Sequence, residues 1–320
     1  MTTASKPARF GSVAIGPLSD ASQVAVRSLS AQAADADGVV PLSEVPLLHL
    51  GKDEPWLTHV IVHADDGSTV GYAHIDRSGD TASAELVVHP AARRLGIGSR
   101  LLKLAEADAR LPGQAGAGNT PGKELRVWAH GDLPAAQAFA SACGYAPARE
   151  LLLLSKSIMP DAAAASLPIL APGYQARVFQ PGDDDAAWVR LNAEVFADHP
   201  EQGRLTLADL QARQQETWFN PADFHLLTTQ QGELVAFNWT KTTPNDPVSS
   251  EIYAIGVQPK HRRRGLSKYL LAKSFSEMAA AGRKRATLYV EGDNEAALAS
   301  YYTAGFAPLT ADVQYAKSPT

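Results

Sequence analysis

Two segments of this 320-residue chain repeat the same residue types at the same spacing, and both are suited to binding phosphate. One contains Arg93-Arg94-Leu95-Gly96-Ile97-Gly98 and the other Arg262-Arg263-Arg264-Gly265-Leu266-Ser267. Glycine lets backbone N–H groups approach an anion closely, and a helix that follows adds unpaired N–H groups and the positive end of its dipole. Arginine adds charge-assisted hydrogen bonds. Each segment therefore predicts a phosphate-binding loop. A tight turn with solvated arginines is the alternative, which the repetition disfavours.

The surrounding elements must hold these loops in place. A short strand pattern precedes each loop, at residues 84–88 and 251–257, and a proline ends it because proline cannot donate to a strand ladder. Apolar residues at helical spacing follow. A second repeat, CGYAP at residues 143–147 and AGFAP at 304–308, indicates that the whole chain is a duplication. We therefore expect an α/β fold (α+β, with a mixed sheet) built twice: one domain over residues 1–155, a linker over 156–173 rich in Ala, Pro and Ser, and a second domain over 174–320.

At these motifs the sequence resembles the GNAT superfamily of acetyl-CoA-dependent N-acetyltransferases (acyl-CoA N-acyltransferases), with one GNAT unit in each half. The resemblance implies that the loop grips the pyrophosphate of acetyl-CoA and that the preceding strand parts from its neighbour at a bulge. The pantetheine arm then pairs with the exposed strand edge. The resemblance allows one molecule of acetyl-CoA in each half. The residues implied to bind it are Leu86, Val87, Val88, Arg94, Leu95, Gly96, Ile97, Gly98 and Ser99 in the first half, and Ile255, Gly256, Val257, Arg262, Arg263, Arg264, Gly265, Leu266, Ser267 and Lys268 in the second.

A helix late in the second half completes the site that the resemblance implies. Asn294 follows Gly-Asp and is suited to cap this helix, and the family also uses this region to contact CoA. The residues concerned are Asn294, Glu295, Ala296, Ala297, Leu298 and Ala299. In many GNAT enzymes a tyrosine four residues before the late glycine gives a proton to the departing thiolate. That position is Tyr301 in the second half and Ala140 in the first.

The motif strand shows the same asymmetry. Aligned through Val-x-Pro, Glu251 falls opposite Ala82. Acetyl transfer needs a neutral amine and a protonated leaving group, and an α-amino group has a pKa of about 7.7–8.0. We therefore expect Glu251 to act as general base, through a water, Tyr301 as general acid, and the backbone N–H near Val257 to polarise the thioester carbonyl. An exposed strand-end carboxylate and a packed aromatic are the alternatives for these two side chains, with Tyr302 as the rival acid.

A closer resemblance points to the acceptor. The segments HPEQG at 199–203, FNWTK at 237–241 and LYVE at 288–291 are similar to the mycothiol synthase family of actinobacteria, over the whole chain. That family acetylates the cysteinyl amine of a cysteinyl-glucosaminyl-inositol, and only its second domain is catalytic. Carboxylates and a few donors suit an acceptor with an ammonium and many hydroxyl groups. The implied acceptor contacts are Glu44, Glu201, Lys241, Glu251 and Tyr289. Each could instead be a solvated or half-buried residue, and Glu44 would have to reach across from the first half.

Composition excludes several other classes of protein. The net charge of −5 provides no general field for nucleic acid, and the basic run 260–264 is explained by its place in the loop. Cys143 is the only cysteine, and no His, Asp or Glu cluster has metal-ligand spacing, so we expect neither a disulfide nor a metal. No apolar run is long enough for a membrane span, and the amino terminus has no apolar signal segment. We expect a cytoplasmic monomer that acts on a small-molecule amine. Two alternatives stay open: a GNAT enzyme for another small-molecule or protein amine, and a non-catalytic acetyl-CoA-binding regulatory module.

Overall fold

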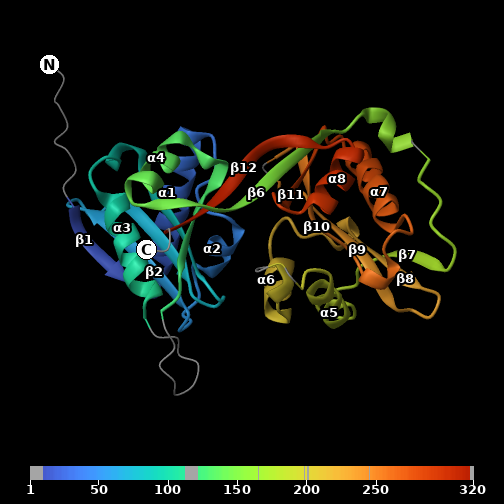
Figure 1. The fold of residues 1–320 in the computed structure, drawn as a ribbon, viewed down its shortest axis with the longest axis horizontal. Helices are drawn as coiled ribbons and strands as arrows, with labels where there is room; N and C mark the ends of the chain where they lie inside the picture. The colour runs from blue at the N-terminus through green and yellow to red at the C-terminus, as the bar shows by residue number, and fades with distance from the viewer. Residues whose placement is uncertain are drawn as a thin grey trace. The chain divides into compact units, whose positions relative to one another are not determined.

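The computed structural model describes residues 10–111, 122–164, 166–197, 199, 202–244 and 246–317, which form two compact units (Figure 1). The first unit takes its described residues from 1–150 and from 311 onward, and the second takes its own from 151–310. Among the described residues, no helix is both long and apolar enough to cross a membrane.

The first unit is a mixed sheet with helices on its faces. Its elements are β1 Phe10–Ile15, α1 Asp20–Asp37, α2 Glu44–His49, β2 Leu57–Ala64, β3 Thr69–Asp76, β4 Ala82–Val88, η1 Pro90–Ala92, α3 Ile97–Ala109, β5 Leu125–Ala129, η2 His130–Asp132, α4 Pro134–Ala142 and the end of β12 Ala307–Lys317. The strands pair in the order β1, β2, β3, β4, β5 and β12. All pairs are antiparallel except β4 with β5, which is parallel.

The second unit repeats this arrangement. Its elements are the end of β6 Tyr145–Ser157, η3 Pro160–Ala164, β7 Tyr174–Val178, α5 Asp185–Val195, η4 Gln202–Arg204, α6 Leu207–Gln214, η5 Pro221–Asp223, β8 Phe224–Thr229, β9 Leu234–Lys241, β10 Ser249–Val257, η6 Pro259–His261, α7 Leu266–Ala280, β11 Arg285–Glu291 and α8 Glu295–Thr303. Its strands pair in the order β7, β8, β9, β10, β11 and β6, with only β10 and β11 parallel. The strand–loop–helix order predicted from the repeated motif is present in both units.

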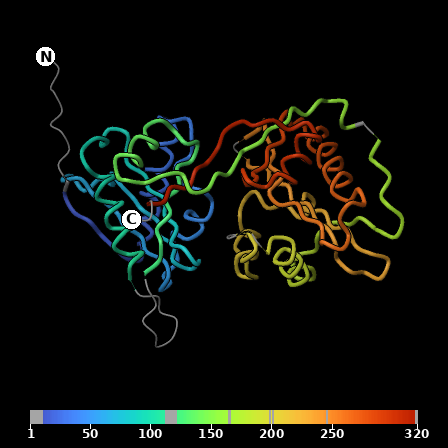
Figure 2. Tube along the Cα trace, in the orientation of Figure 1, coloured from blue at the N-terminus to red at the C-terminus, as the bar shows by residue number. Residues whose placement is uncertain are grey.

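The last strand of each sheet comes from the other half of the sequence. Residues 151–157 of β6 pair with β11 of the second unit, although β6 begins in the first. Residues 313–316 of β12 pair with β5 of the first unit, and Figure 2 shows the red end of the trace lying among the blue and green segments. Each half therefore supplies the strand that completes the other half's sheet.

Each sheet separates two apolar cores, because strand residues alternate between its faces. In the second unit, one core contains Leu271 of α7, Leu288 of β11 and Phe306; we call this side the α7 face. The opposite core contains Trp188 of α5 and Phe237 of β9, and we call it the α5 face. The corresponding sides of the first sheet are the α3 face and the α1 face.

Candidate active site

In the second unit, the two central parallel strands, β10 and β11, separate from each other. β10 pairs with β11 only from Ser249–Arg285 to Glu251–Thr287, yet β10 continues to Val257 and β11 to Glu291. On its other side β10 stays paired with β9 as far as Val257. The backbone groups of residues 255–257 that point toward β11 therefore lie at an opened edge, where an extended ligand can add as a strand does. The same separation occurs in the first unit, where β4 and β5 pair only as far as Glu85–Trp128.

A β-bulge decides which way the predicted base points. Ile252 lies opposite Thr240 and Ala254 lies opposite Trp239, so Tyr253 is an extra residue in β10. An extra residue reverses the alternation of side chains on either side of it. Ile252 and Ile255 both pack on the α7 face, and Glu251, next to Ile252, consequently projects on the α5 face.

The first unit has no such bulge, since β4 pairs regularly with β3 from Ser83 to Val88. Ala82, the sequence counterpart of Glu251, therefore packs in the core of the α3 face. The bulge thus turns Glu251 to the α5 face, whereas Ala82, at the matching position of the regular strand β4, faces the opposite core.

The two predicted phosphate loops have the same backbone shape. Arg263 and Gly265 have φ angles of 59° and 76°, and their counterparts Arg94 and Gly96 have φ angles of 65° and 87°. Left-handed residues beside right-handed ones turn successive N–H groups inward and form an anion-binding concavity. The first N–H groups of α7 and α3 follow directly and lack partners within their helices. Both loops can therefore hold a pyrophosphate.

The arginines around the two loops differ in their partners. Arg262 and Arg93 each donate from Nε to the carbonyl at the end of the preceding strand, Val257 at 3.2 Å and Val88 at 3.3 Å. Arg93 also makes a two-pronged ion pair with Asp37, at 2.7 and 2.6 Å. Arg262 to Arg264 are exposed. The second loop thus offers the more accessible positive charge.

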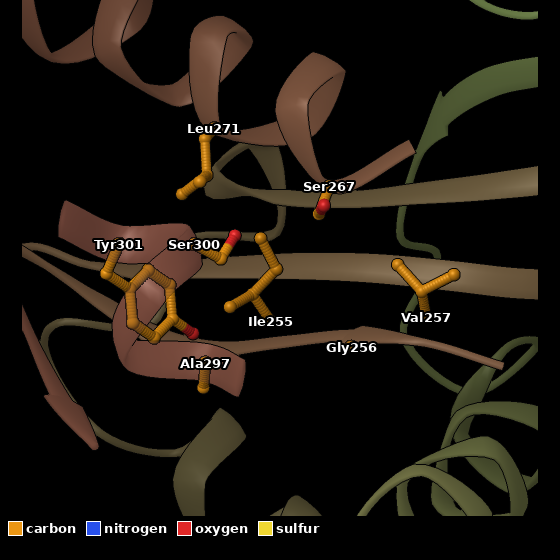
Figure 3. Close-up of a pocket in the computed structure, with 8 residues that line it drawn as sticks. All are labelled: Ile255, Gly256, Val257, Ser267, Leu271, Ala297, Ser300 and Tyr301. Carbon is orange, nitrogen blue, oxygen red and sulfur yellow. The ribbon is translucent and has the colours of Figure 1, made fainter. Parts of the chain in front are cut away.

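A cavity of about 110 Å³ opens where β10 leaves β11. It is lined by Ile255, Gly256, Val257, Ser267, Leu271, Ala297, Ser300 and Tyr301. Figure 3 shows Tyr301 turned from α8 toward Ile255, while Ser267 and Leu271 project from α7. Such a volume suits the end of a longer ligand rather than the whole of one. The cavity therefore connects the phosphate loop to the opened strand edge.

The structure distinguishes the two candidate acids. Tyr301 lines the cavity, and burial raises its pKa to about 12, so its hydroxyl stays protonated over the ordinary pH range. Tyr302 is 45% exposed and is not among the residues that line the cavity. Asn294 caps α8, as predicted, by accepting from the N–H of Ala297 at 3.1 Å. Of the two candidate tyrosines, Tyr301 is thus the one that lines the cavity.

The first unit has no tyrosine at the position that matches Tyr301, and it carries a cluster of charged side chains on its α1 face. Ala140 stands at the position of Tyr301 and belongs to the core of the α3 face. Glu85, only 6% exposed, accepts from the N–H and the hydroxyl of Ser43, both at 2.6 Å. His130 lies 3.1 Å from Glu85 and 2.9 Å from Asp312 of β12. We call these four residues the Glu85 network. It occupies the α1 face where β4 and β5 begin to part.

The charges of the Glu85 network support one another. Burial alone would lower the pKa of His130, but the carboxylates of Glu85 and Asp312 outweigh it and raise that pKa to about 10. Burial likewise opposes the charge on Glu85, and His130 and Ser43 outweigh it, so the pKa of Glu85 is lowered. The corresponding positions in the second unit are Ala254 and Glu291, which form no such pair. The first unit therefore holds a buried ion pair on its α1 face, where β4 and β5 part.

The α5 face of the second unit carries most of the predicted acceptor contacts. Lys241 ends β9 directly opposite Glu251, and Tyr289 of β11 is 43% exposed. Glu291, two residues further along β11, pairs with His199 at 3.3 Å. The structure thus brings Lys241, Glu251 and Tyr289 to one face of neighbouring strands. Glu44 begins α2 of the first unit, and Glu201 lies outside the described residues.

Sequence reasoning missed the aromatic residues behind Lys241. Its ammonium lies 4.6 Å from the ring centre of Trp218 and 5.2 Å from that of Tyr253. Trp218 follows α6 in a loop with no motif, and Tyr253 is the bulged residue, so neither carries a sequence signal for this position. Among the described residues no group of three or more His, Cys, Asp or Glu is arranged to hold a metal ion.

Sequence comparisons match both units to acetyltransferases. The acetyltransferase (GNAT) family matches residues 188–306, and a second acetyltransferase (GNAT) domain matches residues 56–147. The chain is 44% identical over 316 residues to a mycothiol acetyltransferase of Sanguibacter keddieii, covering 95% of this chain and 96% of the relative. It is 42% identical over 319 residues to one of Kineococcus radiotolerans, covering 98% and 99%.

Solved structures show the same fold. A GCN5-related N-acetyltransferase from Sphaerobacter thermophilus superposes with a TM-score of 0.66 at 23% identity, covering 95% of this chain and 94% of its own. A tandem GNAT protein from the clavulanic acid biosynthesis pathway gives a TM-score of 0.69 at 18% identity, covering 97% and 100%. The predicted duplication of a GNAT fold is confirmed.

Proposed function

The chain belongs to the mycothiol acetyltransferase family and is an acetyl-CoA-dependent N-acetyltransferase, and we propose that it makes mycothiol. In the proposed reaction an acetyl group passes from acetyl-CoA to the cysteinyl amine of 1D-myo-inositol 2-(L-cysteinylamino)-2-deoxy-glucopyranoside, giving mycothiol and CoA. The observation that carries the proposal for this chain is in the second unit: Tyr301 lines the cavity at the parted strands, and the β10 bulge turns Glu251 to the α5 face.

We assign the chemistry to two side chains of the second unit. Glu251 accepts the proton that the ammonium must lose, through a water, before the nitrogen can attack the thioester carbon. The backbone N–H at Val257 polarises the carbonyl oxygen. As the new C–N bond forms and the C–S bond breaks, Tyr301 gives its phenolic proton to the leaving sulfur. The raised pKa of Tyr301, due to burial, keeps that proton in place until the thiolate departs.

The cofactor residues follow from the shape of the backbone. We infer that the opened edge at residues 255–257 pairs with the pantetheine arm, and that the loop 262–268 with the start of α7 holds the pyrophosphate. The start of α8, residues 294–299, flanks the same cavity through Ala297. Residues 86–88 and 94–99 have matching backbone geometry and form the second seat for acetyl-CoA that we propose in the first unit.

The first unit is proposed to bind and not to react. It has the loop, but Ala140 has no proton to give and the Glu85 network fills the side from which an amine would approach. Acceptor binding is assigned to Lys241, Glu251 and Tyr289 on the α5 face, while the acceptor contacts expected of Glu201 and Glu44 stay predictions.

The test is product detection by mass spectrometry. The purified protein is incubated with acetyl-CoA and either the cysteinyl-glucosaminyl-inositol or the glucosaminyl-inositol that lacks cysteine. Direct detection of mass is needed because the thiol of the acceptor would react in a colorimetric assay for CoA. A product heavier by one acetyl group, formed only with the cysteinyl acceptor, supports the proposal. Absence of product despite acetyl-CoA binding would refute it and direct the search to another amine.

A further inference from the structure

The ammonium of Lys241 is held in an aromatic corner on the α5 face. It lies 4.6 Å from the centre of the Trp218 ring and 5.2 Å from that of Tyr253, and these two ring centres are 5.2 Å apart. Trp218 is 7% exposed. Contact of a cation with two ring faces is electrostatically favourable, and more so when water is excluded.

The two rings are themselves fixed from behind. The hydroxyl of Tyr253 accepts a hydrogen bond from Nε of Arg213 at 2.6 Å, and Arg213 donates from its guanidinium to the carbonyl of Asp209 at 2.9 Å. Trp239 packs against both Trp218 and Tyr253, with ring centres 5.5 and 4.9 Å away. Both rings of the corner are therefore held by contacts other than those with Lys241.

The corner places a positive charge next to the predicted base. Lys241 and Glu251 are directly opposite each other on neighbouring strands, and their side chains project on the same face. A lysine side chain loses much rotamer freedom when it is fixed. Rings that already restrict it reduce that cost at the moment of binding.

We propose that Trp218 and Tyr253 are positioning residues that fix the Lys241 ammonium for recognition of the hydroxyl-bearing part of the acceptor. This inference rests on the proposed function. An ammonium offers three donors, which suit the oxygens of a sugar or cyclitol, whereas the acceptor amine needs the carboxylate beside it. The site then binds the two ends of its acceptor with two fixed, opposite charges. Tyr253 acquires its part in this arrangement through the same bulge that turns Glu251.

The kinetic test compares Trp218→Leu, Trp218→Phe and Tyr253→Phe. Loss of the indole in Trp218→Leu is expected to raise the KM for the cysteinyl acceptor about three- to thirtyfold, the range of a cation–π contact. Trp218→Phe retains a ring and restores most of the affinity. Tyr253→Phe keeps its ring but loses the bond from Arg213, and has an intermediate effect. The KM for acetyl-CoA stays within about twofold, because the cavity of Tyr301 is lined by other residues.

A double-mutant cycle separates positioning from general packing. If Trp218 acts through Lys241, Trp218→Leu has little further effect on the acceptor KM when Lys241→Met is already present. The matched control is Phe219→Leu, which removes a ring that packs on Trp239 in the same core. An unchanged acceptor KM in Trp218→Leu, or effects that add fully with Lys241→Met, would overturn the proposal.

A spectroscopic measurement tests the positioning without turnover. The lysines of the full chain are converted to ¹³C-dimethyl-lysine, which retains the charge, and the Lys241 signal is identified by its loss in Lys241→Met. The signal is expected to be displaced by ring currents and to return to the position of solvated lysines in Trp218→Leu. An undisplaced signal in the parent protein would refute the positioning. Displacement without acetylation of the cysteinyl acceptor would refute the proposed acceptor instead.

Discussion

Replacing Tyr301 by phenylalanine removes a single oxygen atom from the cavity and tests the role assigned to it. General acid catalysis contributes about 10²- to 10⁴-fold, and most when the pKa of the acid is close to that of the group it protonates. Burial raises the pKa of Tyr301 to about 12, well above the value of about 8.5 for an ordinary thiol. We therefore expect the lower end of that range, a loss of about 10²-fold in the acetyl-transfer step, or about 2.7 kcal/mol.

The assay must report the chemical step. Single-turnover rapid quench with saturating acetyl-CoA does so, because product release then cannot mask the loss. Acetyl-CoA affinity should be unchanged, since the ring that packs against Phe306 is retained. The control is Tyr302→Phe, which alters the exposed neighbour and should leave the rate unchanged. A loss below about threefold in Tyr301→Phe would refute the role of general acid.

Three further predictions concern the base, the loops and pH. Glu251→Gln should slow acetyl transfer about 10²-fold near neutral pH, and rate–pH profiles should show recovery above about pH 8, where the amine loses its proton unaided. Gly265→Ala puts a Cβ on a residue at φ 76° and should raise the KM for acetyl-CoA several-fold. Gly96→Ala does the same at φ 87° in the first unit, and in calorimetric titration it should weaken only the binding of acetyl-CoA to that unit. Burial lowers the pKa of His74 to about 4, so its contribution to stability is lost as pH falls from about 6.5 toward 4. The pKa of His130 is raised to about 10, so its contribution to stability is lost as pH rises from about 6.5 toward 10. The urea midpoint of the first unit, measured by pulsed hydrogen exchange, should therefore be highest near pH 6.5. A midpoint that does not change from pH 5 to 9 would contradict this prediction.

The sequence was sufficient for the parts of the fold that local chemistry determines. Glycines at positive φ, prolines at strand ends and helical spacing of apolar residues predicted both loops and the helices after them, and Asn294 caps its helix as expected. The exchange of the strands β6 and β12 between the two units could not be predicted from local residue patterns. It depends on pairing between segments far apart in sequence, and a strand pattern does not specify its partner.

The site was harder to predict than the fold for a related reason. The β10 bulge is centred on Tyr253, which is neither glycine nor proline, so no residue type in the sequence predicts the bulge. Without the bulge, strand alternation would assign Glu251 to the same face as Ala82, the interior of the helix-covered core. The Glu85 network was equally hidden, since its members come from residues 43, 85, 130 and 312 and meet only in the folded first unit.

These differences explain how two copies of one domain can share a cofactor loop and differ in chemistry. The loops are the same to within a few degrees of φ at Arg94 and Arg263. The two units differ at the gap between the parallel strands. In the second unit a single inserted residue turns Glu251 to the α5 face and sets the Tyr253 ring beside Lys241, while Tyr301, the proposed proton donor, lines the cavity on the other face. In the first unit the strand runs without a bulge, and Glu85 and His130 form a buried ion pair on the side from which we propose that an amine would enter. Restoring a tyrosine at position 140 alone is therefore expected to give no acetyl transfer in the first unit, because the acceptor side would still be closed.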